Sequence, residues 1–325
     1  MAMLPKEAKE FTADDGVKIK YIDKGHDKEN PEQHTVVLIH GLTSHSLMWT
    51  GAGDRCGYTG ANCIDILVEN GFRVLIPDCR GHGISDHPKK EEDYGLNMIT
   101  DQIKLLDEVS VKKAHFVGYS MGAEIILRLA VTFPDRILSL STGGSGWSTM
   151  KWTNDMYRSP MFHRLIPIFP YCCCCCYDSK AIDCNSVKPC MSGMNKINGI
   201  EKEKLKNITV PIQSYSGEKD QELQFHKRMI GILPEKQFSL YILPQPGCCV
   251  GCCVDAHSIA VGNEKYKQIV LEFLLNVRNG KGVLDPKELG GMDVIPLAPK
   301  VLEKMERMEE SDVEFAETSY WTGGA

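Results

Sequence analysis

Ser120 is the residue best placed to do chemistry, because it is the centre of Gly118-Tyr119-Ser120-Met121-Gly122. Residues 114–117 before it are typical of a short buried strand, and residues 123–132 after it are typical of a helix with one apolar face. A serine at such a corner is held in a strained turn with its hydroxyl exposed. We therefore predict that Ser120 is a nucleophile; a glycine-rich turn without a chemical role is the alternative.

A serine hydroxyl is a poor nucleophile at neutral pH, so it needs a general base and an acid that orients this base. Residues 210–217 indicate a strand that ends in a glycine turn, and Glu218, Asp220 and Glu222 follow it. Residues 238–243 indicate the next strand, and the loop after it carries His257. We predict that His257 is the base, because it follows the acidic residues and lies in the loop after this strand, whereas His226 lies on a predicted helix.

Most of the other histidines have ordinary explanations. Some lie in polar, loop-like stretches, and others lie within predicted elements or in the central insertion: His26, His34, His87, His115, His163 and His226.

The order of serine, acid and histidine on alternating strands and helices resembles the α/β-hydrolase fold family over about residues 11–278. The resemblance implies that Asp220 is the acid, three residues after Gly217, with Glu218 and Glu222 as the alternatives. It also implies that His40-Gly41-Leu42-Thr43 forms the oxyanion loop, in which the backbone N–H groups of Leu42 and Met121 stabilise the tetrahedral intermediate. His40 would then hold the loop and transfer no proton.

A second motif strengthens the resemblance. Residues 77–85 follow a predicted strand at residues 72–76 and match the family's tight turn, so we interpret Asp78, Arg80 and His82 as its scaffold. Two features argue against relatives with a carboxylate nucleophile, such as haloalkane dehalogenases and epoxide hydrolases. Position 120 is serine and not aspartate, and Leu42 stands where those relatives are expected to have asparagine.

We expect an α/β-hydrolase fold with a mostly parallel central sheet, flanking helices and an inserted cap. Residues 11–22 indicate an opening hairpin with Asp15-Gly16 at its turn. The first part of the core would span residues 1–146, the cap 147–206, the second part of the core 207–280, and a C-terminal tail 281–325. Val301, Leu302, Met305 and Met308 indicate a short amphipathic helix in the tail.

The predicted cap is rich in apolar side chains that suit a moderately apolar acyl group, although a plain cap core explains them equally well. The residues that we expect to line the substrate pocket are Trp49, Tyr119, Trp147, Met150, Trp152 and Met161.

Composition restricts the function classes. A chain of 325 residues with 42% hydrophobic residues can form one large core with an insertion. The net charge of -6 and the pI near 6.0 provide no basic field for nucleic acid. Met1 to Glu10 contain no apolar secretory signal, and no apolar run is long enough to span a bilayer, so we expect a cytoplasmic protein; a truncated signal is the alternative.

Cysteines are unusually frequent. There are 14, with five consecutive at 172–176 and four within 248–253, where Gly247-Cys248-Cys249-Val250 is repeated at once as Gly251-Cys252-Cys253-Val254. We interpret these runs as repeat variation. Metal binding or redox control, and S-acylation of residues 172–176, are the alternatives. A reducing compartment would keep these thiols free.

The sequence therefore predicts a serine hydrolase that cleaves a carboxylic ester of a small to medium, moderately apolar substrate through an acyl-enzyme, without cofactor or metal. The alternatives on this fold are a carbon–carbon bond hydrolase, lactonase, perhydrolase or acyltransferase. A non-catalytic ligand-binding protein and a thiol-rich metal-binding protein are the alternatives from other classes.

Overall fold

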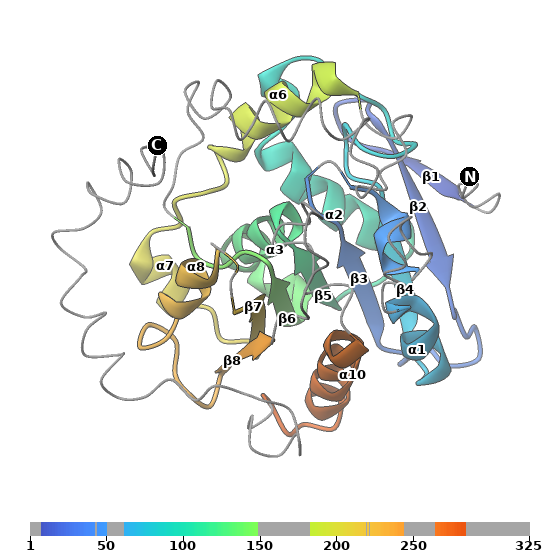
Figure 1. Cartoon of the computed structure of the whole chain (residues 1–325). Helices are drawn as coiled ribbons and strands as arrows, with labels where there is room; N and C mark the ends of the chain where they lie inside the picture. Colours follow the sequence, from blue (N-terminus) through green and yellow to red (C-terminus); the bar gives the residue numbers. More distant parts are fainter. Residues whose placement is uncertain are drawn as a thin grey trace, which may run out of the picture.

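A single twisted sheet organises the computed structural model, which describes residues 8–42, 44–50, 62–148, 183–218, 220, 222–243 and 264–283. Its eight strands follow the order β1-β2-β4-β3-β5-β6-β7-β8 (Figure 1). The strands are β1 (Lys9–Thr12), β2 (Lys18–Lys24), β3 (Thr35–Ile39), β4 (Arg73–Pro77), β5 (Ala114–Tyr119), β6 (Ile137–Gly143), β7 (Ile212–Gly217) and β8 (Phe238–Leu243).

β2 pairs antiparallel with β1 and with β4, and every other neighbouring pair is parallel. The predicted fold class, a mostly parallel sheet with helices between its strands, is therefore confirmed. The predicted opening hairpin is also present: the Ala13 amide donates to the Val17 carbonyl at 2.8 Å, and Gly16 adopts φ 87° in the turn.

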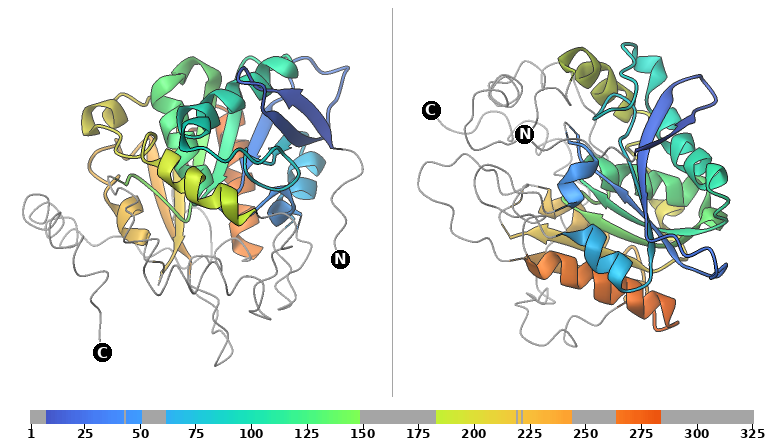
Figure 2. Two further views of the ribbon diagram at one scale, coloured as in Figure 1. Left: turned by 90° about the horizontal axis from the view of Figure 1, so that it is seen from above. Right: turned by 90° about the vertical axis from the view of Figure 1, so that its right-hand side faces the viewer.

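Helices cover both faces of the sheet. They are α1 (Cys63–Glu69), α2 (Leu96–Glu108), α3 (Met121–Thr132), α6 (Cys184–Met194), α7 (Lys202–Lys206), α8 (Leu223–Lys227) and α10 (Glu264–Arg278), with short 3-10 turns η1 (Ser46–Trp49), η2 (Glu91–Asp93) and η3 (Pro134–Arg136). Figure 2 shows α1 and α10 on one face, and α2 and α3 on the other.

Each face contributes its own apolar core. Met98 and Leu105 of α2 and Ile125 and Leu129 of α3 pack in the first core, together with side chains of the sheet. The second core holds residues of α1 and α10, including Phe273, against the opposite face. The central strands β3 and β4 are buried along their whole length, which explains their continuous apolar sequences.

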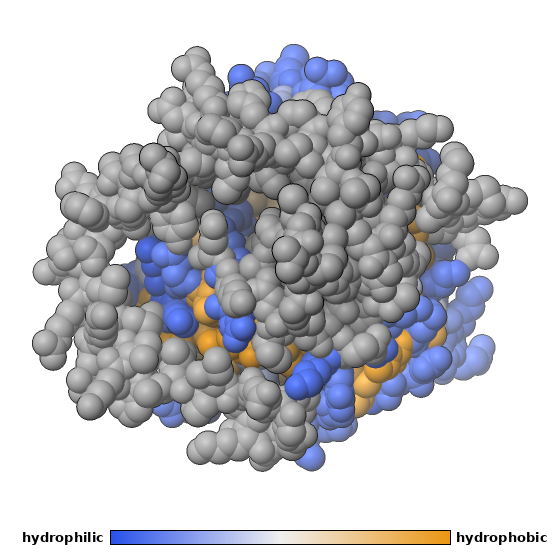
Figure 3. Space-filling view, in the orientation of Figure 1, coloured by the Kyte–Doolittle hydropathy of each residue, from blue (hydrophilic) through white to orange (hydrophobic). Residues whose placement is uncertain are grey.

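The described surface is mostly polar. On the face in Figure 3, hydrophilic residues form much of the rim and hydrophobic residues show between them. Among the residues that the structure describes, Leu96 is the one large hydrophobic side chain that is exposed. None of the helices within the described ranges has both the length and the apolar character needed to cross a membrane.

The chain leaves the sheet after β6 and returns before β7 through a closed stem. The Gly199 amide donates to the Ser148 carbonyl at 3.1 Å, and Trp147 Nε1 donates to the Ile200 carbonyl at 2.7 Å. Arg128 of α3 adds hydrogen bonds to the carbonyls of Ile197 and Asn198 at 2.6 and 2.9 Å. We keep the cap boundaries of 147–206 as a prediction.

Several sequence features lie outside the described residues. They are the cysteine runs at 172–176 and 248–253 and the expected tail helix around residues 301–308.

Candidate active site

The expected site residues follow strands that end at one edge of the sheet. The register pairs Ile39 with Gly118, Tyr119 with Gly143, and Gly217 with Leu243. The carboxyl ends of β3, β5, β6, β7 and β8 therefore lie side by side, which is where open α/β sheets bind ligands. The predicted oxyanion loop, nucleophile, acid and base-bearing loop follow β3, β5, β7 and β8, respectively.

Ser120 occupies the corner between β5 and α3 in a strained backbone conformation. Its φ of 53° and ψ of -116° lie in a region that residues with a side chain rarely adopt. Its amide is held by a hydrogen bond to the Gly143 carbonyl at 2.7 Å. Ser120 is half-buried, so its side chain keeps some exposure at the carboxyl edge of the sheet.

The glycines of the motif are required by close packing. A Cβ atom at Gly118 would overlap the Gly122 carbonyl, and one at Gly122 would overlap the Ile39 carbonyl. β5 and α3 can therefore approach β3 only if both positions lack a side chain. The spacing of the two glycines around Ser120 follows from this packing.

The loop after β3 lies directly against the serine. A Cβ atom at Gly41 would lie 3.3 Å from Ser120 Cβ and 3.9 Å from Ser120 Oγ. Leu42 is the next residue of this loop, and Met121 is the first residue of α3, whose amide is among those that a helix leaves without an intrahelical partner. This proximity favours the predicted roles of both amides.

His40 links this loop to the turn after β4 through hydrogen bonds. Its Nε2 accepts a hydrogen bond from the Cys79 amide at 3.0 Å, so the ring proton is on Nδ1, which donates to the Gly41 carbonyl at 2.8 Å. Burial lowers the pKa of His40 to about 3. A buried neutral imidazole with both nitrogens engaged fits the interpretation of His40 as a structural residue.

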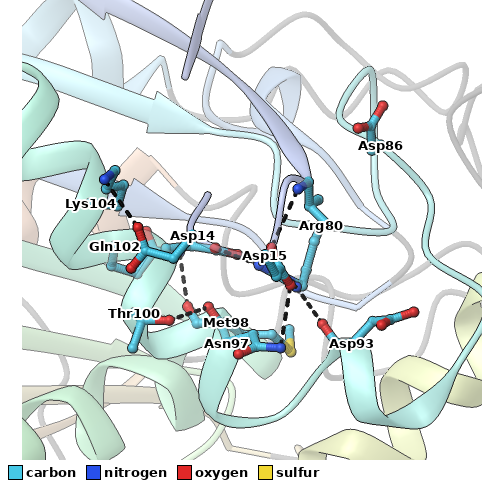
Figure 4. Close-up of polar contacts among 12 residues, drawn as sticks. Asp14, Asp15, Arg80, Asp86, Asp93, Asn97, Met98, Thr100, Gln102 and Lys104 are labelled. Carbon is cyan, nitrogen blue, oxygen red and sulfur yellow. Dashed lines mark hydrogen bonds and ion pairs between the residues drawn. The ribbon is translucent and has the colours of Figure 1, made fainter. Parts of the chain in front are cut away.

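The turn after β4 is a dense polar junction. Asp78 accepts hydrogen bonds from the amides of Ser46 at 2.7 Å and Ile84 at 2.9 Å. Arg80 is bidentate to Asp101, with two contacts of 2.7 Å. Arg80 also pairs with Asp15 at 2.6 Å (Figure 4). The junction thereby joins the opening hairpin, the loop after β3 and α2, as expected of a scaffold.

Asp220 is the best-supported acid among the three candidates. It is buried at 5% exposure, whereas Glu218 is exposed. Its Oδ1 accepts the Glu222 amide at 2.9 Å, and its amide donates to the Gly217 carbonyl at 3.1 Å, so a tight turn holds the carboxylate after β7.

Glu222 has a different environment. The Ser145 hydroxyl lies 3.4 Å from Glu222 Oε2 and 3.3 Å from Glu124 Oε1, which joins the acid loop to α3. Sequence patterns alone did not indicate this junction, because its members come from three separate segments.

His257 lies outside the described residues. The segment that carries it starts after β8 and ends before α10. Since β8 ends beside β7, this segment starts at the same edge as the acid loop. The assignment of His257 as the base stays a prediction.

Two other histidines are buried and take part in hydrogen bonds with serines. His115 Nδ1 lies 2.7 Å from Ser139 Oγ, and His226 Nδ1 lies 2.5 Å from Ser214 Oγ. These contacts agree with the expectation that neither histidine is catalytic.

The expected pocket residues differ in how deeply they are buried, and some of them lie outside the described residues. Trp49 is fully buried and packs with Tyr266 of α10, and Tyr119 is buried with its ring centroid 6.2 Å from that of Tyr215. Trp147 is half-buried at the stem. Met150, Trp152 and Met161 lie outside the described residues. Cys190 of α6 is buried in the core beside the elbow, with its Sγ 4.0 Å from Met121 Sδ.

Comparisons with known proteins agree with this arrangement. The alpha/beta hydrolase fold family profile matches residues 34–161. A carboxylesterase of Nitrososphaera gargenis superposes with a TM-score of 0.65 at 16% identity, covering 84% of this chain and 100% of that chain. Together with the strand order, these similarities show that the chain has the α/β-hydrolase fold.

Curated relatives match over shorter stretches. A 2-hydroxy-6-oxononadienedioate/2-hydroxy-6-oxononatrienedioate hydrolase of Pseudomonas putida is 29% identical over 191 residues, 52% of this chain and 61% of the relative. Epoxide hydrolase A of Mycobacterium tuberculosis is 28% identical over 127 residues, 39% of this chain and 35% of the relative. The matched part of the chain thus spans between about a third and three fifths of the length of these relatives.

Proposed function

We propose that the protein is a serine hydrolase that cleaves carboxylic esters through an acyl-enzyme on Ser120. The observation that carries the proposal is the strained elbow, with the loop after β3 packed against the serine. Strain of this kind persists only where surrounding structure holds it, and it is concentrated at functional sites. The Ser-Asp-His triad of Ser120, Asp220 and His257 is part of the proposal.

The first half-reaction transfers the acyl group to the enzyme. Ser120 Oγ attacks the ester carbonyl carbon while His257 accepts the hydroxyl proton. The resulting oxyanion is stabilised by the amides of Leu42 and Met121, each of which typically lowers such a barrier by about 3 kcal/mol. The C–O bond then breaks, and the alcohol leaves with the proton from His257.

The second half-reaction releases the acid. His257 takes a proton from water, the hydroxide attacks the acyl carbon, and the oxyanion forms again at the same amides. When the bond to Ser120 breaks, His257 returns the proton to Oγ. Asp220 orients His257 and stabilises its protonated form in both steps, a role that its buried position after β7 supports.

An apolar acyl group of small to medium size is part of the proposal, which the apolar residues near Met121 support. Leu42 and Trp147 pack against the same core cluster that contains Met121 and Cys190. A cytoplasmic location is part of the proposal, because a chain with 14 cysteines keeps its thiols free most readily in a reducing compartment.

Labelling with a tagged fluorophosphonate tests the proposal, because the reagent captures an activated serine. We expect mass spectrometry to find the label on Ser120, and the Ser120→Ala variant to lose both the label and turnover of short-chain aryl esters. Ser110→Ala is the matched control, because Ser110 is the other described non-glycine residue with a positive φ, and it lies on an exposed turn. Full ester turnover by a folded Ser120→Ala variant would refute the proposal.

Carbon–carbon bond hydrolysis is the second candidate, favoured by the match of over half of this chain to the Pseudomonas putida relative. A vinylogous 1,5-diketone acid assayed beside aryl esters separates the two: faster turnover of the diketone would favour this candidate. Epoxide opening is disfavoured, because position 120 is a serine and that reaction needs a carboxylate nucleophile in this family.

A further inference from the structure

A short segment after β6 lies between the nucleophile corner and the segment that carries the acid. The Gly143 carbonyl accepts the Ser120 amide at 2.7 Å, and the ring of Tyr215 on β7 occupies the space that a Cβ atom at Gly143 would need. The Gly144 amide donates to the Tyr215 carbonyl at 3.2 Å. Tyr215, five residues before Asp220, therefore supports the residue that binds the Ser120 amide.

The same segment then packs closely on α8. A Cβ atom at Gly146 would lie only 2.7 Å from backbone atoms of Phe225 and His226. The Trp147 amide donates to the Phe225 carbonyl at 3.2 Å. Because α8 follows the acid loop and β7 precedes it, residues 143–147 have backbone contacts with the elements on both sides of Asp220.

Ser145 connects the nucleophile helix with the acid loop through its hydroxyl. This side chain is buried, and its Oγ lies 3.3 Å from Glu124 Oε1 and 3.4 Å from Glu222 Oε2. A hydroxyl has one proton, so at these nearly equal distances the two carboxylates share a single donor. Removal of this hydroxyl would thus take away the donor that holds two like charges close together.

The backbone of each glutamate is bonded in turn to a proposed catalytic residue. The Glu124 amide donates to the Ser120 carbonyl at 3.2 Å in the first turn of α3. The Glu222 amide donates to Asp220 Oδ1 at 2.9 Å. A continuous series of contacts through Ser145 therefore connects the Ser120 backbone with the Asp220 carboxylate.

We propose that Ser145 is a positioning residue that holds the Asp220 carboxylate at a fixed place relative to Ser120. This inference rests on the proposed function, in which Ser120 and Asp220 are two members of the triad. Ser145 acts through Glu124 on the side of the nucleophile and through Glu222 on the side of the acid. A displacement of about 1 Å in a catalytic site can reduce a rate by about 100-fold, so loss of the hydroxyl should affect chemistry more than binding.

The first test removes the hydroxyl. We expect Ser145→Ala to lower the rate of fluorophosphonate labelling at Ser120 by roughly tenfold, and to lower kcat for an aryl ester with little change of KM. Glu124→Ala interrupts the same series of contacts at α3, where alanine favours the helix, and should have a similar effect. This second variant keeps the test decisive if Ser145→Ala does not fold.

A double-mutant cycle with Asp220→Asn distinguishes positioning from a general structural role. Asparagine keeps an oxygen that can accept the Glu222 amide, and it removes the carboxylate charge. If Ser145 acts by placing this carboxylate, Ser145→Ala should slow labelling of the Asp220→Asn variant by less than about twofold. Independent effects multiply, so a further decrease of roughly tenfold in the double variant would refute the positioning role. An Asp220→Asn variant that is labelled at the wild-type rate would refute it as well.

Ser139→Ala is the matched control. Ser139 is a buried serine of β6, the strand that precedes Ser145, and its Oγ lies 2.7 Å from His115 Nδ1 near the opposite end of this strand. Both substitutions remove one buried hydroxyl, so we expect a comparable loss of thermal stability. Ser139→Ala should nevertheless keep the wild-type labelling rate and kcat.

The outcomes separate this inference from the proposed function. If the wild type is labelled at Ser120 and the folded Ser145→Ala and Glu124→Ala variants are labelled at the same rate, the positioning role is refuted and the function stands. A decrease of equal size in Ser139→Ala also refutes it. If the wild type itself is not labelled at Ser120, the proposed function fails, and the positioning role fails with it.

Discussion

Nδ1 of His34 lies 2.8 Å from Nε2 of His115 at the start of the parallel strands. The other ring nitrogen of His115 contacts Ser139 Oγ at 2.7 Å, so the imidazole is engaged on both sides. Only one proton fits between the two facing nitrogens, which disfavours charging both rings. Burial lowers the pKa of both histidines, that of His115 to about 3, and the nearby Arg278 acts in the same direction, while Glu32 opposes it at His34.

We predict that this pair makes stability depend on pH. Since the pKa of His115 is about 3 in the folded state and near 6.5 in the unfolded state, its contribution is present above about pH 6.5 and is lost as pH falls toward 3. Between pH 7.5 and 5, His115 should account for about 2 kcal/mol of the loss in unfolding free energy. Urea denaturation of His115→Asn should show a correspondingly smaller loss over this interval, and an unchanged loss would show that other groups cause it.

We predict that Arg80→Lys destabilises the fold by about 3 kcal/mol, because lysine keeps the charge and loses the bidentate geometry in a buried pair. Arg80 and Asp101 are 1% and 3% exposed. Arg136→Lys is the control, since the Arg136–Asp107 pair is at the surface and should contribute less than about 1 kcal/mol. Equal effects of the two substitutions on chemical denaturation would contradict the scaffold role of Arg80.

We predict that Gln213→Leu is neutral or stabilises the protein by up to about 1 kcal/mol. Gln213 is fully buried in β7, and in the described structure neither its amide nitrogen nor its oxygen has a hydrogen-bond partner. Leucine removes this unsatisfied group at similar volume. The neighbouring Ser214→Ala should instead cost about 1 to 3 kcal/mol, because Ser214 bonds with Thr142 and His226. A marked loss of stability in Gln213→Leu would reveal a partner for the amide.

We predict that Cys190 resists alkylation in the native protein. It is fully buried, and burial raises its pKa to about 12, so almost no thiolate exists at pH 8. Mass spectrometry after brief iodoacetamide treatment should find Cys190 unmodified in buffer and modified in urea. Rapid modification in buffer would mean that α6 separates readily from α3.

Much of the sheet could be predicted, because its strands are apolar runs bounded by residues that disfavour strands. The strand at residues 238–243 has the predicted limits, and the helix after Ser120 starts two residues earlier than expected. α6 was not predicted, and it contains Pro189 and Gly193, two residue types that helix interiors disfavour. Its buried Val187, Cys190, Met191 and Met194 nevertheless have helical spacing, and this signal could have identified it.

The candidate site also has features that could be predicted from the sequence and features that could not. Ser120 and its glycines were predictable, since their spacing reflects local geometry at one corner. The support of Gly143 by Tyr215 was not, because it depends on the register between two strands that are nearly seventy residues apart in the chain. Contacts of that kind appear only when the pairing of strands is known.

The closed stem between Ser148 and Gly199 affects which changes of sequence length the chain can tolerate. Because the segment departs and returns at hydrogen-bonded neighbours, insertions or deletions between these two points need not displace β6 or β7. Evolution could therefore vary the length and sequence of the intervening segment while the sheet stayed unchanged. A designer could use the same junction to exchange this segment between relatives without rebuilding the core.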